Sequence, residues 1–167
     1  LENRLKEEFG LKETRIVNTL GHNEAGALAE LGRAAAEFLM KLLRPYDILG
    51  VAWGRTTREV AKQMPQYPVE GVRVVSLNGC TYEHMLDEDL FEVERIFGRK
   101  LGGKLYLLYT PIIVSTPEIK EVYLSDTHTR MTMEYIERSS ITLNGIGKFR
   151  RESMLYRYGY ISEEEWT

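Results

Sequence analysis

The sequence is poor in the residues that mark secreted, membrane-spanning and metal-binding proteins. Its 167 residues include one cysteine, Cys80, so no disulfide can form within the chain, which suits a reducing compartment. No apolar run approaches the ~18 residues that a membrane-spanning helix needs. The three histidines lie far apart and lack the spacing or cysteine partners of a zinc site. We therefore expect a cytoplasmic protein that spans no membrane and uses no metal or other cofactor.

Neither positive nor negative charge dominates the sequence. The net charge is −3, and no run of like charge exceeds the triplet Glu163-Glu164-Glu165. A DNA-binding surface needs clustered lysine and arginine to neutralise phosphates, so this composition disfavours such a surface on this chain. Common motifs are missing as well: there is no P-loop, no Gly-x-Ser-x-Gly turn, and no third glycine after Gly145-x-Gly147.

Strand-like and helix-like patterns alternate along the chain. This alternation is typical of a single α/β domain over residues 1–167, with a mostly parallel sheet flanked by helices. Periodicity and helix-end signals predict strands over 14–20, 47–53, 72–77, 104–109 and 141–146, and helices over 1–9, 23–43, 56–64, 87–101, 117–124, 129–138, 152–158 and 162–165. The apolar face of the longest helix is predicted to consist of Leu28, Leu31, Ala35, Phe38, Leu39 and Leu42.

The stretch from Asp47 to Ala61 carries the strongest functional signal. A branched apolar run ends at Trp53, Gly54 breaks it, and a helix follows that opens with two threonines. The N–H groups of a first helical turn lack partners within the helix, and the helix dipole favours an anion there. Arg55 and the hydroxyls of Thr56 and Thr57 would add side-chain donors. Alternatively, Thr56 only caps the helix and Gly54 only turns the chain.

Two other turns are predicted to meet this one. Ligands of parallel sheets bind beyond the carboxyl ends of the strands. Three such ends carry polar or glycine-rich turns: Gly54-Arg55-Thr56, Asn78-Gly79-Cys80 and Gly145-Ile146-Gly147-Lys148. Lys148, Arg150 and Arg151 either bring positive charge to the same rim or form a solvated loop.

Two nearby features are open to a catalytic and a structural interpretation. Cys80 is either a thiol of lowered pKa or a small residue where the backbone needs room. The acidic residues between Glu83 and Asp89 are explained by a helix N-terminus without any catalytic role.

Several different short blocks of residues follow one another along the chain in an order that is typical of one protein family. They are Leu1-Glu-x-Arg-Leu-Lys-Glu-x-Phe-Gly-Leu11, Leu31-Gly-Arg-Ala-Ala-Ala36, Gly50-Val-Ala-Trp-Gly-Arg-Thr56, Leu77-Asn-Gly79, Lys100-Leu-Gly-Gly103, Tyr106-Leu-Leu-Tyr-Thr-Pro111, Leu124-Ser-Asp126, Gly145-Ile-Gly147 and Gly159-Tyr-Ile-Ser-Glu-Glu164. In this order they resemble the effector-binding domain of the SorC family of bacterial transcription regulators. The resemblance implies a Rossmann-like fold, similar to that of sugar-phosphate isomerases and deaminases, with its C-terminal part missing. It also implies a phosphorylated sugar as effector and a homo-oligomer, dimer or tetramer. Operator DNA would be bound only through an N-terminal helix-turn-helix domain, which is absent from this chain.

The resemblance also assigns ligand contacts. Gly54, Arg55 and Thr56 match the phosphate-binding turn, and Thr57 replaces a residue that is more usually aliphatic. Asn78 and Gly79 match the next ligand loop, where many relatives have a glycine in place of Cys80. Asp89 falls near a position that often bears an amide contacting the sugar, and Arg151 lies where some relatives place a basic contact. The expected site therefore comprises Gly54, Arg55, Thr56, Thr57, Asn78, Gly79, Cys80, Asp89, Lys148 and Arg151, with no catalytic residue.

Three functions fit this sequence. The first is a sensor whose sugar-phosphate ligand alters DNA binding by an attached domain. The second is an isomerase- or deaminase-type enzyme, which would need a positioned general base. The third is an assembly module, because Leu1, Leu5 and Phe9 form an apolar stripe on the first helix. That stripe packs either on the domain's own core or on a second chain.

Overall fold

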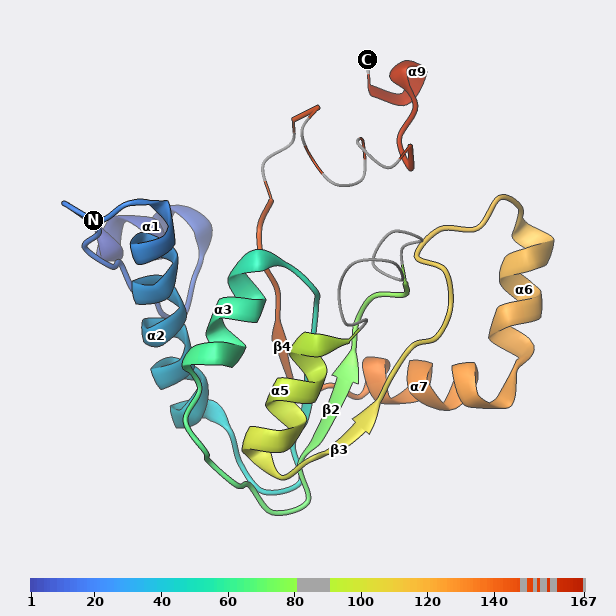
Figure 1. Cartoon of the computed structure of the whole chain (residues 1–167), viewed down its shortest axis with the longest axis horizontal. Helices are drawn as coiled ribbons and strands as arrows, with labels where there is room; N and C mark the ends of the chain where they lie inside the picture. Colours follow the sequence, from blue (N-terminus) through green and yellow to red (C-terminus); the bar gives the residue numbers. More distant parts are fainter. Residues whose placement is uncertain (81–90, 148–149, 152, 154–155, 157–158, 167) are drawn as a thin grey trace.

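A parallel sheet forms the centre of the molecule. The computed structural model describes residues 1–80, 91–147, 150, 151, 153, 156 and 159–166. Within this part, the strands are β1 (Ile48–Val51), β2 (Arg73–Ser76), β3 (Lys104–Tyr106) and β4 (Ile141–Leu143), in the order β3-β2-β1-β4. All three neighbouring pairs are parallel, and Val51 lies opposite both Ser76 and Leu143. The prediction of an α/β fold with a parallel sheet is confirmed (Figure 1).

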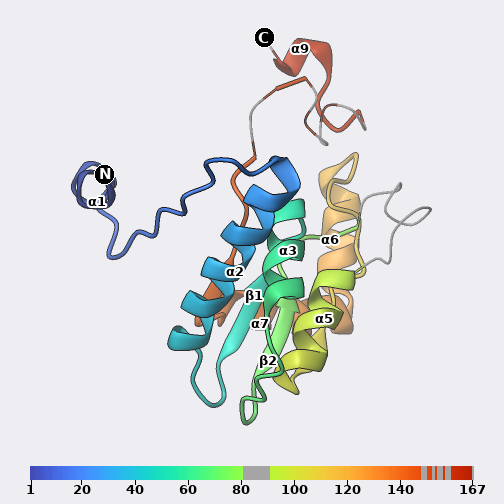
Figure 2. The same ribbon diagram turned by 60° about the vertical axis from the view of Figure 1, so that its left-hand side comes forward.

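Helices cover both faces of this sheet. In the described part of the chain they are α1 (Glu2–Phe9), α2 (Glu24–Leu42), α3 (Arg55–Gln63), α5 (Glu92–Leu101), α6 (Pro117–Ser125), α7 (Thr127–Glu137) and α9 (Glu163–Trp166). Figure 2 shows α2, α3 and α5 side by side on one face, with α7 behind the sheet. Among the described helices, none is both long and apolar enough to cross a membrane.

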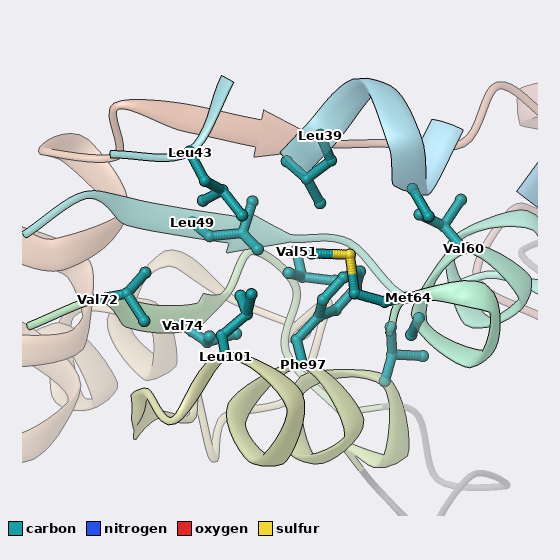
Figure 3. Close-up of a cluster of buried hydrophobic side chains, with 13 residues drawn as sticks. Leu39, Leu43, Leu49, Val51, Val60, Met64, Val72, Val74, Phe97 and Leu101 are labelled. Carbon is teal, nitrogen blue, oxygen red and sulfur yellow. The ribbon is translucent and has the colours of Figure 1, made fainter. Parts of the chain in front are cut away.

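The main core lies between the sheet and the layer of α2, α3 and α5. Alternate residues of β1 and β2 point into it, as strand geometry requires, and Leu49, Val51 and Val74 are fully buried there. Phe97 of α5 and Met64, just after α3, fill the space above these strands (Figure 3). This packed layer holds the start of α3 rigidly against the end of β1.

The face of α2 that packs on the core overlaps the predicted apolar face only in part, at Leu39, which is buried, and at Ala35, which packs against the core. The buried residues are Gly32, Ala36 and Leu39, followed by Leu43 at the helix end. Leu31 and Leu42, which belong to the predicted apolar face, are 41% and 44% exposed. The reason lies at Gly32: a Cβ atom there would lie 2.8 Å from Cγ and 3.0 Å from the backbone carbon of Glu59, so the missing side chain lets α3 approach α2 closely. Because α2 turns its Gly32 side toward α3, a second apolar stripe remains on the outer flank of α2.

The strand predicted over residues 14–20 does not form. This stretch is irregular, and its backbone bonds to a side chain, since Ile16 N donates to Glu2 Oε1 at 2.7 Å. Branched residues favour extended backbone, but an extended segment becomes a strand only when a sheet edge pairs with it.

Other predicted elements are present with shifted ends. Helix α5 begins at Glu92, because Phe91 has a left-handed backbone with φ 72°. Gly102 ends that helix in the left-handed conformation expected of a C-cap glycine. Residues 87–90 of the predicted helix, and most of the predicted helix over 152–158, lie outside the described residues.

Candidate functional site

The carboxyl ends of β1 and β4 meet where the strand order reverses direction. From β1 the chain passes through α3 to β2 on one side, whereas β4 lies on the other side. Such a reversal is the point at which open parallel sheets bind ligands. The turn after β1 and the loop after β4 touch there: a Cβ atom on Gly145 would lie 3.9 Å from the Cβ of Thr56.

Gly54 shapes the turn between β1 and α3. Its backbone has φ 155° and ψ 159°, a region that is essentially restricted to glycine. Its carbonyl accepts hydrogen bonds from Arg58 N and Thr57 Oγ1, both at 2.9 Å. These bonds close the first turn of α3 from the inside.

Among the described residues, no side chain caps the first turn of α3. Side chains of Asn23, Thr116 and Asp126 accept hydrogen bonds from the first turns of α2, α6 and α7, whereas α3, like α1 and α5, has no such bond within the described part of the chain. The N–H groups at the start of α3 are therefore available to an acceptor that is not part of these turns, and the helix dipole favours a negatively charged one.

Three side chains of this turn have different surroundings. Thr57 is 1% exposed and its hydroxyl already donates to Gly54, so it supports the turn from below. Thr56 is half-buried next to Gly145. The side chain of Arg55 is 84% exposed and forms an ion pair with Glu24 Oε1 at 3.0 Å, which joins the starts of α3 and α2.

The loop after β2 is held by close backbone contact with residues 110–112. Gly79 is buried, and a Cβ atom there would lie 2.4 Å from the carbonyl oxygen of Thr110, so no larger residue fits. Cys80 N donates to Thr110 O at 2.6 Å, and Ile112 N donates to Cys80 O at 2.9 Å. Beside this rigid loop, Asn78 Oδ1 is buried without a hydrogen-bond partner among the described residues. A buried acceptor of this kind is ready for a hydroxyl or amide donor from a ligand.

The surroundings of Cys80 favour the structural interpretation of this residue. Burial, with a smaller effect from the nearby carboxylate of Glu94, raises the pKa of its thiol above the ordinary value. A raised pKa keeps the group protonated at neutral pH, and the thiolate is the nucleophilic form. Its Sγ lies 3.7 Å from Leu108 O.

Glu94 is a buried acid that the sequence analysis did not single out. It is 2% exposed in the first turn of α5, and burial raises the pKa of its carboxyl to about 7. Position 94 shares a helix face with Phe97 and Leu101, and this periodicity could have revealed it as a core-facing acid. On the same turn, Glu92 forms an ion pair with Arg58 of α3, with Nε and Oε2 2.6 Å apart.

The structure leaves parts of the predicted site untested. Asp89 and Lys148 lie outside the described residues. The guanidinium of Arg151 forms an ion pair with Glu163 Oε1 at 2.7 Å and lies 5.6 Å from the ring centroid of Tyr156. Within the described part of the chain, no group of three or more His, Cys, Asp or Glu side chains is arranged to hold a metal ion.

Comparison with known proteins identifies the family. Residues 1–167 match the family model described as "Putative sugar-binding domain". The chain belongs to this family. The sugar-binding domain is 30% identical over 161 residues to the deoxyribonucleoside regulator of Bacillus subtilis strain 168, covering 96% of this chain and 51% of that protein. It is 28% identical over 151 residues to the sorbitol operon regulator of Klebsiella pneumoniae, covering 88% and 47%.

Solved structures agree with this assignment. The full-length sorbitol operon regulator SorC of Klebsiella pneumoniae superimposes with a TM-score of 0.84 at 25% identity, covering 98% of this chain and 54% of that one. The probable sor operon regulator of Shigella flexneri gives 0.81 at 28%, covering 88% and 61%. The predicted resemblance to the SorC family is confirmed, and this sugar-binding domain spans about half the length of the curated relatives it matches.

Proposed function

We propose that this sugar-binding domain senses a phosphorylated sugar for a transcriptional regulator. The observation that carries the proposal is the start of α3, which lacks a side-chain cap and lies where the strand order reverses. A phosphate there would accept hydrogen bonds from the first-turn N–H groups and from Thr56 and Arg55. The buried Oδ1 of Asn78 would accept a hydrogen bond from a sugar hydroxyl.

Sensing requires that the ligand favour one state of the regulator over another. Equal affinity for two states shifts nothing, so the sugar phosphate must bind one arrangement of a homo-oligomer, a dimer or tetramer, more tightly. The altered arrangement would change operator binding by an attached helix-turn-helix domain. We place this regulator in the cytoplasm, where both DNA and phosphorylated sugars occur.

The enzyme hypothesis is not supported. Relatives such as the deoxyribonucleoside, sorbitol operon and erythritol catabolism regulators are named for regulation. Our proposal is therefore binding without turnover. To check this, the protein would be incubated with a sugar phosphate, and we expect the sugar phosphate to be recovered chemically unchanged.

A thermal-shift panel tests the proposal. The protein would be melted with phosphorylated pentoses, hexoses and polyols, with the same sugars lacking phosphate, and with inorganic phosphate. A ligand at ~100 times its Kd adds roughly 2.7 kcal/mol of stability. We expect at least one phosphorylated sugar to raise the melting temperature well above its unphosphorylated counterpart. Equal shifts with and without phosphate would contradict the phosphate contact, and no shift with any sugar would contradict sugar sensing.

A further inference from the structure

The start of α3 carries charge of the sign that a helix N-terminus disfavours. A helix dipole favours acids in the first turn and disfavours cations there. Several described helices follow this rule and have a glutamate in the first turn: Glu2 in α1, Glu24 in α2, Glu92 in α5 and Glu118 in α6. The first turn of α3 contains no acid, and Arg55 and Arg58 are its first and fourth residues. The start of α3 therefore takes its negative charge from other elements.

Two neighbouring helices supply this charge in different ways. Glu92 of α5 pairs with Arg58, and both side chains are half-buried. Glu24 of α2 pairs with Arg55, with Oε1 and Nη1 3.0 Å apart, but these side chains are 83% and 84% exposed. The half-buried pair belongs to the packing of α3 on α5, whereas so exposed a pair contributes little and opens readily. The Glu24–Arg55 pair is therefore the one that an incoming anion can replace.

The backbone of α2 keeps the carboxylate of Glu24 close to this turn. Glu24 is the first residue of α2, and Asn23 caps the helix by accepting a hydrogen bond from Gly26 N at 2.9 Å. Further along, Gly32 packs α2 directly on Glu59 of α3. Figure 2 shows the two helices side by side, with their first turns at the same edge of the sheet. The carboxylate is thus tethered beside Arg55 at a high effective concentration.

An exchange of partners at Arg55 costs the carboxylate little and favours a phosphate. When Glu24 is released, its carboxylate is still in water at the N-terminus of α2, where the helix dipole favours it. A phosphate carries more negative charge than a carboxylate and offers three acceptor oxygens to Arg55. The arginine therefore changes partner when a phosphate arrives and returns to Glu24 when the phosphate leaves.

We propose that Glu24 is an internal competitor of the effector phosphate, which occupies Arg55 in the free protein and so sets the effector concentration at which the sensor responds. This inference rests on the proposed function, because it needs a phosphate at the start of α3. An exposed ion pair is closed about one to five times as often as it is open. Apparent affinity falls in proportion to the fraction of molecules whose binding group is free. Glu24 should therefore weaken phosphate binding roughly two- to sixfold.

Inorganic phosphate is the probe that tests this turn without any sugar contact. Isothermal titration calorimetry on the whole chain would measure its Kd at constant ionic strength, because salt screens exposed charges. We expect Glu24→Gln to lower the Kd roughly two- to sixfold. Glu37→Gln is the matched control, since this exposed glutamate pairs with Arg33 on the same helix, and it should leave the Kd unchanged. In an Arg55→Ala background, Glu24→Gln should change the Kd less than about twofold, because the group for which it competes is gone.

The possible results separate this inference from the proposed function. A lower Kd in Glu24→Gln that depends on Arg55 supports competition. A higher Kd would show that the ion pair holds Arg55 ready for phosphate, and an unchanged Kd would show that Glu24 does not compete. An equal gain in the Arg55→Ala background would show general charge repulsion. Each of these three results overturns the inference and leaves the phosphate site standing, whereas absence of phosphate binding to all the proteins overturns both.

Discussion

The guanidinium of Arg55 is shared between a neighbouring carboxylate and the proposed ligand. Its ion pair with Glu24 is exposed on both sides, and exposed pairs contribute only about 0–1 kcal/mol. A hydrogen bond from a charged group to phosphate contributes about 1.5–3 kcal/mol. A phosphate bound at this turn would therefore win the competition, and we expect the ion pair to open when the proposed ligand binds.

Arg55→Ala and Thr56→Ala should each weaken sugar-phosphate binding about tenfold or more, because each removes one donor to the phosphate. Isothermal titration calorimetry would measure both dissociation constants. Arg33→Ala is the matched control, since this exposed arginine forms its ion pairs with Glu30 and Glu37 on its own helix. Unchanged affinity in both site variants would refute the phosphate contact.

Glu94 makes stability depend on pH. Burial raises the pKa of its carboxyl from an ordinary value of 4.5 to about 7, so between these pH values the folded state binds more protons than the unfolded state. The free energy of unfolding contributed by Glu94 therefore falls as pH rises from about 4.5 to 7, by at most roughly 1.4 kcal/mol for each pH unit.

Glu94→Gln should remove this dependence. Compared with wild type, the variant should gain stability as pH rises from 5 to 8, on the order of 2 kcal/mol by the upper end. Urea unfolding at pH 5, 6, 7 and 8 would give the difference in free energy of unfolding between the variant and the wild type. Other carboxylates contribute equally to both proteins, so their effects cancel in this difference. The exposed Glu121→Gln serves as control and should leave the difference flat.

Within helix α2, two glycine positions allow the effect of helix propensity on stability to be distinguished from the effect of packing against a neighbouring helix. Alanine favours a helix over glycine by about 0.8–1 kcal/mol at any interior position. At Gly32 a Cβ atom would meet the backbone of Glu59 at 3.0 Å, which cannot yield without moving α3. At Gly26 the nearest atom, at 3.1 Å, belongs to the exposed side chain of His22, which can turn away.

Gly32→Ala should therefore destabilise the protein by about 1–3 kcal/mol, because the cost of overpacking exceeds the gain in propensity. Gly26→Ala should be neutral or stabilising. Chemical denaturation of the two variants beside wild type would measure both changes. Equal stabilisation by both would show that α2 and α3 separate without cost.

The same helix shows how far the sequence could predict the fold. Its length and ends were predicted within one residue, because Asn23 caps it and Pro45 follows. Two adjacent stripes, Leu31-Ala35-Phe38-Leu42 and Gly32-Ala36-Leu39-Leu43, are both apolar, so periodicity alone could not decide which one faces the core. The decision comes from the close approach at Gly32, which is a property of the packed pair of helices.

The site was predictable to a similar extent. Alternation placed the turns after β1, β2 and β4 at one edge of a parallel sheet, and the structure brings Thr56 and Gly145 together there. The order of the strands in the sheet, which makes the β1–β4 junction the point of reversal, could not be predicted from the local sequence patterns of the strands and helices. The ligand contacts of Asn78, Arg151 and the others stay predictions until a ligand is bound.

At the scale of the whole molecule, residues 1–167 should not bind DNA specifically. The chain has a net charge of −3, and apart from the short group Lys148, Arg150 and Arg151 its lysines and arginines are spread over the sequence. Fluorescence anisotropy with operator fragments of a related regulon, measured at two salt concentrations, would check this. A tight, sequence-specific and salt-sensitive complex would contradict the assignment of DNA binding to a separate domain.

The ion pair between α2 and the proposed phosphate turn gives protein concentration a route to regulate sugar affinity. Helix α2 touches α3 at Gly32, and its Glu24 forms an ion pair with Arg55. If the proposed ligand favours one arrangement of a homo-oligomer, its own affinity must change by the same factor when that arrangement forms. The apparent sugar-phosphate Kd should therefore drift across a dilution series that spans dissociation of the homo-oligomer. A cell that makes more of this regulator would thereby also shift the concentration of sugar to which it responds.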